Sequence, residues 1–361
     1  MRKTRGHVIH VESLADLDRR LASGATQLGG WRIHELDLSD RTEVLLSKGI
    51  AGATFLGCTF GPGEAERIGA AGGLVLPMLG TVPIDPYRSR LYTAEDLYDT
   101  PDYSDSYDAM AYSWSQTGRG QDDHLAATLH DHAIDDALAT WRAPRRLAGV
   151  MGAHAAVRGD ATYLEAAALG HDLGAHLTLA TGGGPGAMEA VNLGARFARA
   201  PRQALDEAIS MLAAVPSFQP SVDRWLRTAQ QVLATAETAN QSLGIPTWHY
   251  GHEPANVFAT AIAKYVHNAT REAILLEICD AGIVFLPGAG GTVQEIFQDA
   301  CENYYADETS VAPMVLVGVE YWTETLPAWP LLRSLARGRP MEEHVHLVST
   351  VTDAVALLSD R

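Results

Sequence analysis

The chain has 361 residues, of which 47% are hydrophobic and 20% charged, and its formal net charge is −17. This length favours one large domain with an accessory segment. The acidic balance argues against nucleic acid as a partner, because that function needs clustered basic residues. The sequence contains no apolar stretch typical of a signal peptide or a membrane span, so we expect a cytoplasmic protein with no membrane partner.

The first 105 residues predict an N-terminal accessory domain of α+β type. Ser13 is a plausible N-cap for a short amphipathic helix, and β-like runs follow at 31–38, 53–60 and 73–79. We find no internal repeat and no binding motif here, which favours a structural or oligomerising role. Residues 106–143 form a connector that ends in a predicted helix over 125–143.

Residues 144–361 alternate between strand and helix patterns. Short apolar runs at 145–152, 176–181, 245–253, 282–288 and 312–319 predict strands, and Asp160 is placed to cap the helix after the first of them. Such alternation predicts an α/β fold, a Rossmann-like doubly wound parallel sheet with helices on both faces. Ligands of such sheets bind beyond the carboxyl ends of the strands.

Glycine clusters follow two of the predicted strands at that edge. The first is "TGGGPGAME", residues 181–189, and the second is "PGAGGTVQE", residues 287–295. Glycine exposes the backbone, and the helix that follows offers free N–H groups and a positive dipole end, so both corners favour phosphate. Neither spacing is that of a P-loop or of a dinucleotide fingerprint. The candidate phosphate-binding residues are Gly152, Gly182, Gly183, Gly184, Gly186, Glu189, Gly288, Gly290, Gly291 and Thr292.

These two motifs, in this order, resemble the LONELY GUY (LOG) family, whose members were formerly labelled lysine decarboxylases. The first corner is most similar to the larger nucleoside-monophosphate nucleosidases related to that family. The family pattern P-G-G-x-G-T-x-x-E is matched over 287–295, except that Ala289 stands where the family has a glycine. The resemblance extends from about residue 145 to the C-terminus.

The resemblance implies a phosphoribohydrolase, which hydrolyses the N-glycosidic bond of an AMP-like nucleoside 5′-monophosphate to free base and ribose 5-phosphate. It implies Glu295 and Arg271 as the catalytic pair, no cofactor, and a homodimer or higher homo-oligomer. A carboxylate beside the ribose suits this chemistry because positive charge develops on the sugar as the bond breaks.

Two alternative functions remain open at this stage. A non-catalytic nucleotide sensor could use the same cradle, although it would not need a carboxylate at the ribose. A pyridoxal-phosphate decarboxylase is disfavoured, because Lys264 is the only lysine after Lys48 and has no cofactor context. No metal is expected: the cluster His249, Tyr250, His252 and Glu253 lacks the helical zinc spacing and is more consistent with lining the cleft. Cys58, Cys279 and Cys301 also lack such spacing and predict buried, reduced thiols.

Overall fold

A computed structural model describes residues 8–80, 82–117, 120–235, 240–249 and 253–359 of the chain. The chain divides into two compact units, and neither is continuous in sequence. The smaller unit comprises Met1–Ser89 and Arg119–Ala133, and the larger comprises Arg90–Gly118 and Ile134–Arg361. This division differs from the boundaries expected at residues 105 and 143, because the segment Arg90–Gly118 packs with the larger unit.

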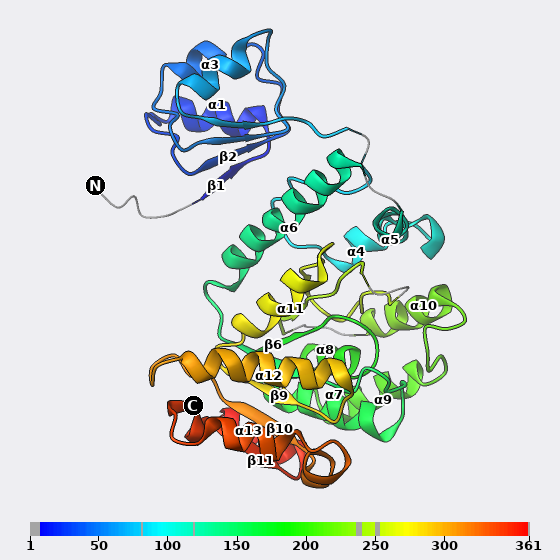
Figure 1. Ribbon diagram of the computed structural model, residues 1–361. Helices are drawn as coiled ribbons and strands as arrows, with labels where there is room; N and C mark the ends of the chain where they lie inside the picture. Colours follow the sequence, from blue (N-terminus) through cyan, green and yellow to red (C-terminus); the bar gives the residue numbers. More distant parts are fainter. Residues whose placement is uncertain (1–7, 81, 118–119, 236–239, 250–252, 360–361) are drawn as a thin grey trace. The chain divides into compact units, whose positions relative to one another are not determined.

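The larger unit is built on a seven-stranded sheet in which every strand pair is parallel (Figure 1). The strand order is β11-β10-β9-β5-β6-β7-β8, so the chain starts in the middle, builds one half and then returns to build the other. The strands are β5 (Leu147–Met151), β6 (Thr178–Thr181), β7 (Ser242–Gly244), β8 (Ala261–Ile262), β9 (Gly282–Phe285), β10 (Met314–Val317) and β11 (Val345–Val348).

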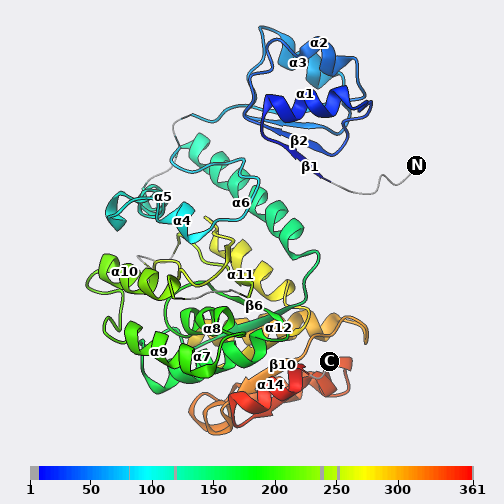
Figure 2. The same cartoon turned by 180° about the vertical axis from the view of Figure 1, so that it is seen from behind.

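Helices cover both faces of this sheet, which confirms the predicted Rossmann-like doubly wound fold (Figures 1 and 2). One face carries α7 (Ala161–Gly174), α8 (Ala187–Arg196) and α14 (Val351–Ser359). The other carries α11 (Asn268–Glu277), α12 (Gly290–Tyr305) and α13 (Ala328–Ala336). The remaining helices of this unit are α4 (Ala94–Leu97), α5 (Tyr107–Gln116), α9 (Arg202–Leu212), α10 (Val222–Leu233) and the second part of α6 (Gln121–Arg142).

Local sequence signals explain most of these elements. All five residues of β5 are buried, as expected for a strand covered on both faces. Asp160 caps α7 as predicted, since its side chain accepts a hydrogen bond from the backbone N–H of Tyr163 at 2.7 Å. The prediction of a strand over 245–253 was wrong for residues 245–249 and 253, because β7 ends at Gly244; residues 250–252 lie outside the described residues.

The smaller unit contains a four-stranded parallel sheet in the order β1-β2-β3-β4. Strands and helices alternate, so this unit is also of α/β type, in contrast to the α+β arrangement expected. Ser13 caps the first helix as predicted, by accepting from the N–H of Asp16 at 3.2 Å. The elements are β1 (Ile9–Val11), α1 (Leu14–Ala22), β2 (Trp31–His34), α2 (Thr42–Leu46), β3 (Thr54–Leu56), α3 (Glu64–Ala70) and β4 (Leu74–Leu76).

This unit is built from internal repeats of one strand and its following segment, which corrects the expectation that the sequence contains no repeat. His10, Arg32, Thr54 and Leu74 occupy equivalent strand positions, at spacings of 22, 22 and 20 residues. Before each of the last three strands stands a glycine in the left-handed region, Gly30, Gly52 or Gly72. Their backbones form a column, with Gly30 N–H donating to Gly52 and Gly52 N–H to Gly72. The unit is therefore a short solenoid of β/α repeats.

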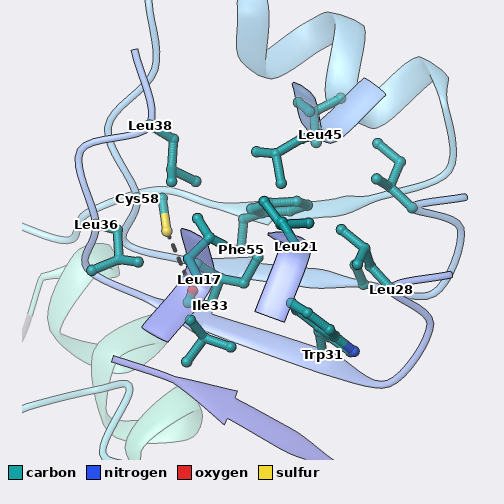
Figure 3. Packing of buried hydrophobic residues seen from close by; sticks show 14 residues of the cluster. Leu17, Leu21, Leu28, Trp31, Ile33, Leu36, Leu38, Leu45, Phe55 and Cys58 are labelled. Carbon is teal, nitrogen blue, oxygen red and sulfur yellow. Dashed lines mark hydrogen bonds between the residues drawn. The ribbon is translucent and has the colours of Figure 1, made fainter. Parts of the chain in front are cut away.

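The core of the smaller unit lies between its sheet and its helices (Figure 3). Ile33 and Phe55 take the same inward position in successive repeats and are fully buried. Cys58 packs in this core as a free thiol, and its Sγ donates to the backbone oxygen of Ile33 at 3.3 Å. Cys279 is also a buried free thiol, but Cys301 is exposed, so the prediction of burial was wrong for that residue. Within the described residues, no helix is long and apolar enough to cross a membrane.

Candidate functional site

The candidate site lies at the carboxyl edge of the large sheet, where its strand order reverses. The reversal falls between β5 and β9, because the chain runs outward from β5 on one side and from β9 on the other. A Cβ on Gly152 would stand 2.3 Å from the backbone oxygen of Leu286, and the φ of Gly152 is +99°. Glycine is therefore required at 152 for the two strand ends to meet closely, and the crevice beyond them is the usual ligand site of this fold.

The second glycine corner, residues 287–292, is open to solvent at its tip. Ala289, Gly290 and Gly291 are exposed, and a Cβ on either glycine would meet no atom within 4 Å. The helix α12 begins here, so its free N–H groups face accessible space. Ala289 has a φ of −98°, which any residue adopts, so an alanine at this position does not strain the loop.

The base of this corner is held by packing. Gly288 lies under Thr292, because a Cβ on Gly288 would stand 2.3 Å from the Thr292 hydroxyl oxygen and 3.1 Å from Cα of Gly152. The Tyr321 hydroxyl donates to the carbonyl of Gly288 at 2.7 Å. Thr292 itself is buried. Of the predicted phosphate-binding residues of this corner, only Gly290 and Gly291 are thus fully accessible, while Gly288 and Thr292 support them.

The first glycine corner, residues 181–186, is buried, in contrast to the second. Its glycines allow close packing: a Cβ on Gly182 would stand 2.5 Å from Arg271 and 2.7 Å from the sulfur of Met188. A Cβ on Gly183 would stand 2.7 Å from Pro246, and one on Gly186 would stand 2.4 Å from the carbonyl of His154. In this structure the backbone of the corner is covered by these groups.

Two asparagines that the sequence analysis did not select fix the shape of the first corner. The Asn256 backbone N–H donates to the carbonyl of Gly183 at 2.8 Å, and its amide nitrogen donates to that of Gly184 at 3.1 Å. Asn192 accepts from the Thr181 hydroxyl at 2.8 Å and from Asn256 at 3.0 Å. Both asparagines are fully buried. These bonds tie the corner to α8 and to the segment after β7.

Arg271, near the start of α11, reaches the edge of the sheet between β6 and β7. Its Nε donates to the carbonyl of Ile245 at 2.7 Å, and a terminal nitrogen donates to that of Gly182 at 3.4 Å. The neighbouring Glu272 has other partners, since it accepts from Asn268 and from Gln294, each at 2.7 Å. Arg271 is therefore held at the edge of the sheet, and its guanidinium lies against the first corner.

Glu295, in the second turn of α12, lies within electrostatic reach of Arg271. Burial raises the pKa of the Glu295 carboxyl to about 7; Arg271 opposes this rise and Glu272 adds to it. A carboxyl that is half protonated near neutral pH can both accept and donate a proton, which is typical of acid–base catalysts. The structure thus brings Arg271, Glu295 and both glycine corners to one edge of the sheet.

Glu189 has a different environment from the one expected for a ligand-binding residue. Both of its carboxylate oxygens accept from Arg158, at distances of 2.5–3.2 Å, and both side chains are 1% exposed. The Arg158 guanidinium also lies over the ring of Trp225 at 4.4 Å and donates to its carbonyl at 3.1 Å. The buried ion pair accounts for Glu189, which ties α8 to the loop after β5.

Two cavities flank the loop after β5. One, of about 270 Å³, is bounded by His154, Phe218, Trp225 and Glu253 beside the first corner. The other, of about 360 Å³, is bounded by Asp160, Pro287 and Gly318. A larger cavity of about 750 Å³ lies at the amino ends of the strands, beside Arg146 and Thr178. Despite its size it lies at the edge opposite the glycine corners, so we place no chemistry there.

The histidine-rich stretch at 249–253 is described only in part. Tyr250 and His252 lie outside the described residues, whereas His249 and Glu253 are exposed. Within the described part of the chain, no three histidine, cysteine, aspartate or glutamate side chains come together as metal ligands. Lys264, which the sequence analysis considered as a cofactor lysine, is 1% exposed and paired with Asp108 at 2.5 Å.

Solved structures that are similar to part of this chain have low sequence identity to it. A molybdenum cofactor binding protein from the phototrophic bacterium Rippkaea orientalis is 18% identical, with a TM-score of 0.36 over 60% of this chain and 96% of that one. The molybdenum cofactor carrier protein from Chlamydomonas reinhardtii is 18% identical, with a TM-score of 0.38 over 60% and 97%. The protein TM1055 is 16% identical, with a TM-score of 0.35 over 60% and 99%.

No family model and no curated protein matches the chain. The larger unit is a Rossmann-like α/β unit. The point where its strand order reverses carries an open helix N-terminus, an arginine and a carboxyl whose pKa is raised. A β/α solenoid is joined to that unit.

Proposed function

We propose that this protein is a phosphoribohydrolase, which hydrolyses the N-glycosidic bond of a nucleoside 5′-monophosphate. One observation carries the proposal: Glu295, whose pKa burial raises to about 7, stands on α12 within electrostatic reach of Arg271, and the N-terminus of α12 is open at Gly290 and Gly291. An anion site, a cation and a titratable carboxyl at one sheet edge match the needs of this reaction.

The geometry of α12 suits a substrate whose phosphate and sugar are joined. In the proposed complex, the free N–H groups at the start of α12 bind the 5′-phosphate. Glu295 follows Gly291 by four residues, or about 6 Å along the helix axis. A ribose attached to the bound phosphate would thus lie beside the Glu295 carboxyl. Binding energy from the phosphate, which does not react, would orient the sugar for reaction.

The proposed reaction adds water to C1′ of the ribose and breaks the bond from C1′ to the base nitrogen. Ionised Glu295 stabilises the positive charge that develops on the sugar and accepts a proton from the attacking water. The departing base takes up a proton from solvent water and Glu295 releases its proton to solvent, so that the products are the free base and ribose 5-phosphate. Arg271, held by the carbonyls of Ile245 and Gly182, supplies a fixed positive charge for the phosphate or the departing base.

The test is incubation of the full chain with AMP, GMP, CMP and UMP, with free base followed by chromatography. We expect release from at least one of them, and loss of nearly all release in Glu295→Gln, which keeps the shape of the side chain but not its charge. Glu277→Gln, at an exposed position on α11, is the matched control for removal of one negative charge and should keep full activity.

Binding and turnover must be measured together. Calorimetry should show that Glu295→Gln still binds the nucleotide. Release of base at an unchanged rate in that variant would contradict the proposed role of the carboxyl. Binding by the natural chain without any release would instead support a nucleotide-binding protein with no hydrolytic activity.

A further inference from the structure

The segment Arg90–Gly118 belongs to the larger unit although it lies between two segments of the smaller unit in the sequence. We call its described part, residues 90–117, the arm. Tyr92 of the arm exchanges backbone hydrogen bonds with Ile262 of β8, at 2.9 and 2.8 Å. The backbone N–H of Tyr103 donates to Asp223 at the start of α10 at 2.7 Å. The arm is thus attached along the side of the unit that carries β8.

The arm also contacts Trp248, which follows β7, and Lys264, which follows β8. Asp108 of α5 is 1% exposed and accepts from the Trp248 indole nitrogen at 2.9 Å and from Lys264 at 2.5 Å. Ser115 and Gln116 donate to the carbonyl of Trp248, at 2.9 and 3.0 Å. Asp108 is therefore a buried anchor for Trp248 and Lys264. Its loss would leave the buried ammonium of Lys264 without that carboxylate.

A third contact lies next to the first glycine corner. The Tyr98 hydroxyl donates to the carbonyl of Ala255 at 2.5 Å, and Tyr98 is 8% exposed. The next residue is Asn256, whose backbone and side chain bind the carbonyls of Gly183 and Gly184. Asn256 also accepts from the N–H groups of Phe258 and Ala259, each at 3.2 Å. Tyr98 thus holds the peptide next to Asn256, and Asn256 in turn binds the corner.

We propose that the arm positions the first glycine corner, and that Tyr98 and Asp108 are its positioning residues. Neither touches the corner: both act through the segment after β7, and Asn256 transmits the constraint. The proposal concerns ligand-free protein and so does not require the function proposed above. Its consequence for catalysis is weaker binding of a nucleotide when the arm contact is lost, because the Gly182 carbonyl of this corner holds Arg271; that consequence does rest on the proposed function.

Hydrogen exchange of the full chain without ligand, followed by mass spectrometry, tests the proposal directly. Tyr98→Phe keeps the ring and removes one hydroxyl. We expect exchange in residues 181–187 to become about fivefold faster, the effect of losing one typical hydrogen bond. Residues 287–292 should be unchanged. Asn256→Asp removes the amide donor next to the corner and is the positive control for a loosened corner.

Tyr321→Phe is the matched control, since its hydroxyl donates to the carbonyl of Gly288 in the second corner. It should speed exchange at 287–292 and leave 181–187 unchanged. If Tyr98→Phe does not fold, the double variant Ser115→Ala with Gln116→Ala removes the two donors to Trp248 and is measured in its place. Exchange at 181–187 that stays at the natural rate in the folded variant would overturn the proposal.

Kinetics give a second readout that general destabilisation would not produce. With a nucleotide that the natural chain hydrolyses, KM for Tyr98→Phe should rise about fivefold while kcat changes by less than about twofold. A fall in kcat alone would contradict a positioning role. If no nucleotide is hydrolysed, the proposed function fails, and the exchange experiment still decides whether the arm positions the corner.

Discussion

Glu295 is a carboxyl group whose protonation is set mainly by burial. Because its pKa of about 7 lies above the ordinary value of 4.5, the folded protein holds this proton over a pH range in which the unfolded chain has released it. Its contribution to stability is therefore fully present below about pH 4.5 and is lost as the pH rises through 7. Glu295 therefore lowers the stability of the fold when it is ionised near neutral pH, and the ionised form is the one that we propose acts in catalysis.

This leads to a stability prediction for Glu295→Gln. Between pH 4.5 and 7.5 the free energy of unfolding of the natural chain should fall, relative to that of the variant, by up to about 3 kcal/mol. Urea denaturation at several pH values measures this difference. The exposed Glu277→Gln should follow the natural chain throughout. A natural chain whose stability rises relative to Glu295→Gln over this range would contradict the raised pKa.

At the same scale, motif and structure agree on some residues and not on others. The resemblance pointed to Arg271 and Glu295, and both lie at the edge with the glycine corners; their catalytic roles stay predictions. Asn192 and Asn256 gave no signal, because an isolated asparagine has no spacing that distinguishes a buried amide from an exposed one. Glu189 was selected for its place after a glycine corner, but its partner, Arg158, is 31 residues away in sequence.

At the scale of elements, the N-terminus of α12 differs from that of α8. Both helices follow a strand and a glycine corner, but only α12 begins in open space. The first corner is covered because Arg271, Met188 and Pro246 pack where side chains are missing from its glycines. By sequence pattern alone, both corners are candidate anion sites. Contacts from distant segments turn the first corner into a packed turn and leave the second as a candidate anion site.

A substitution at Gly291 tests this distinction. Gly291→Val places a branched side chain in open space and over the first turn of α12, because helical side chains lean toward the N-terminus. The fold should be kept, while the affinity for ribose 5-phosphate, measured by calorimetry, should fall at least about tenfold as the free N–H groups are covered. Gly291→Ala should give a smaller loss. Undiminished affinity in Gly291→Val would place the phosphate elsewhere.

For the whole molecule, the division into two units predicts two separable unfolding events. Phe55 is fully buried in the solenoid core, and Leu179 is fully buried in β6 of the larger unit. Phe55→Ala should cost about 3–5 kcal/mol, a loss confined to the solenoid. Ribose 5-phosphate at about 100 times its Kd should stabilise only the larger unit, by about 2.7 kcal/mol.

Calorimetry of the full chain measures both effects. Two transitions are expected. Phe55→Ala should lower the unfolding temperature of the solenoid transition. Ribose 5-phosphate should raise the unfolding temperature of the other transition, that of the larger unit, and Leu179→Ala should lower it. A single transition that all three changes shift would show that the units unfold together.

The sequence by itself determined three features of the larger unit: its α/β fold class, the N-cap of α7 at Asp160, and the strand ends that carry glycine. These depend on neighbours in the chain: apolar runs, a capping carboxylate, and glycines before helices. It did not reveal the solenoid, whose repeats share little beyond Gly30, Gly52, Gly72 and an inward apolar residue. Those positions become equivalent only when strands stack.

Only the tertiary structure decided which groups act together. The arm joins the larger unit because Asp108, Trp248 and Lys264 meet across more than a hundred residues of chain. Arg271 approaches Glu295 because α11 and α12 pack on the same face of the sheet. The pKa of Glu295 likewise depends on what buries it. Such properties arise from pairs of distant residues, and local sequence does not encode the distance between them.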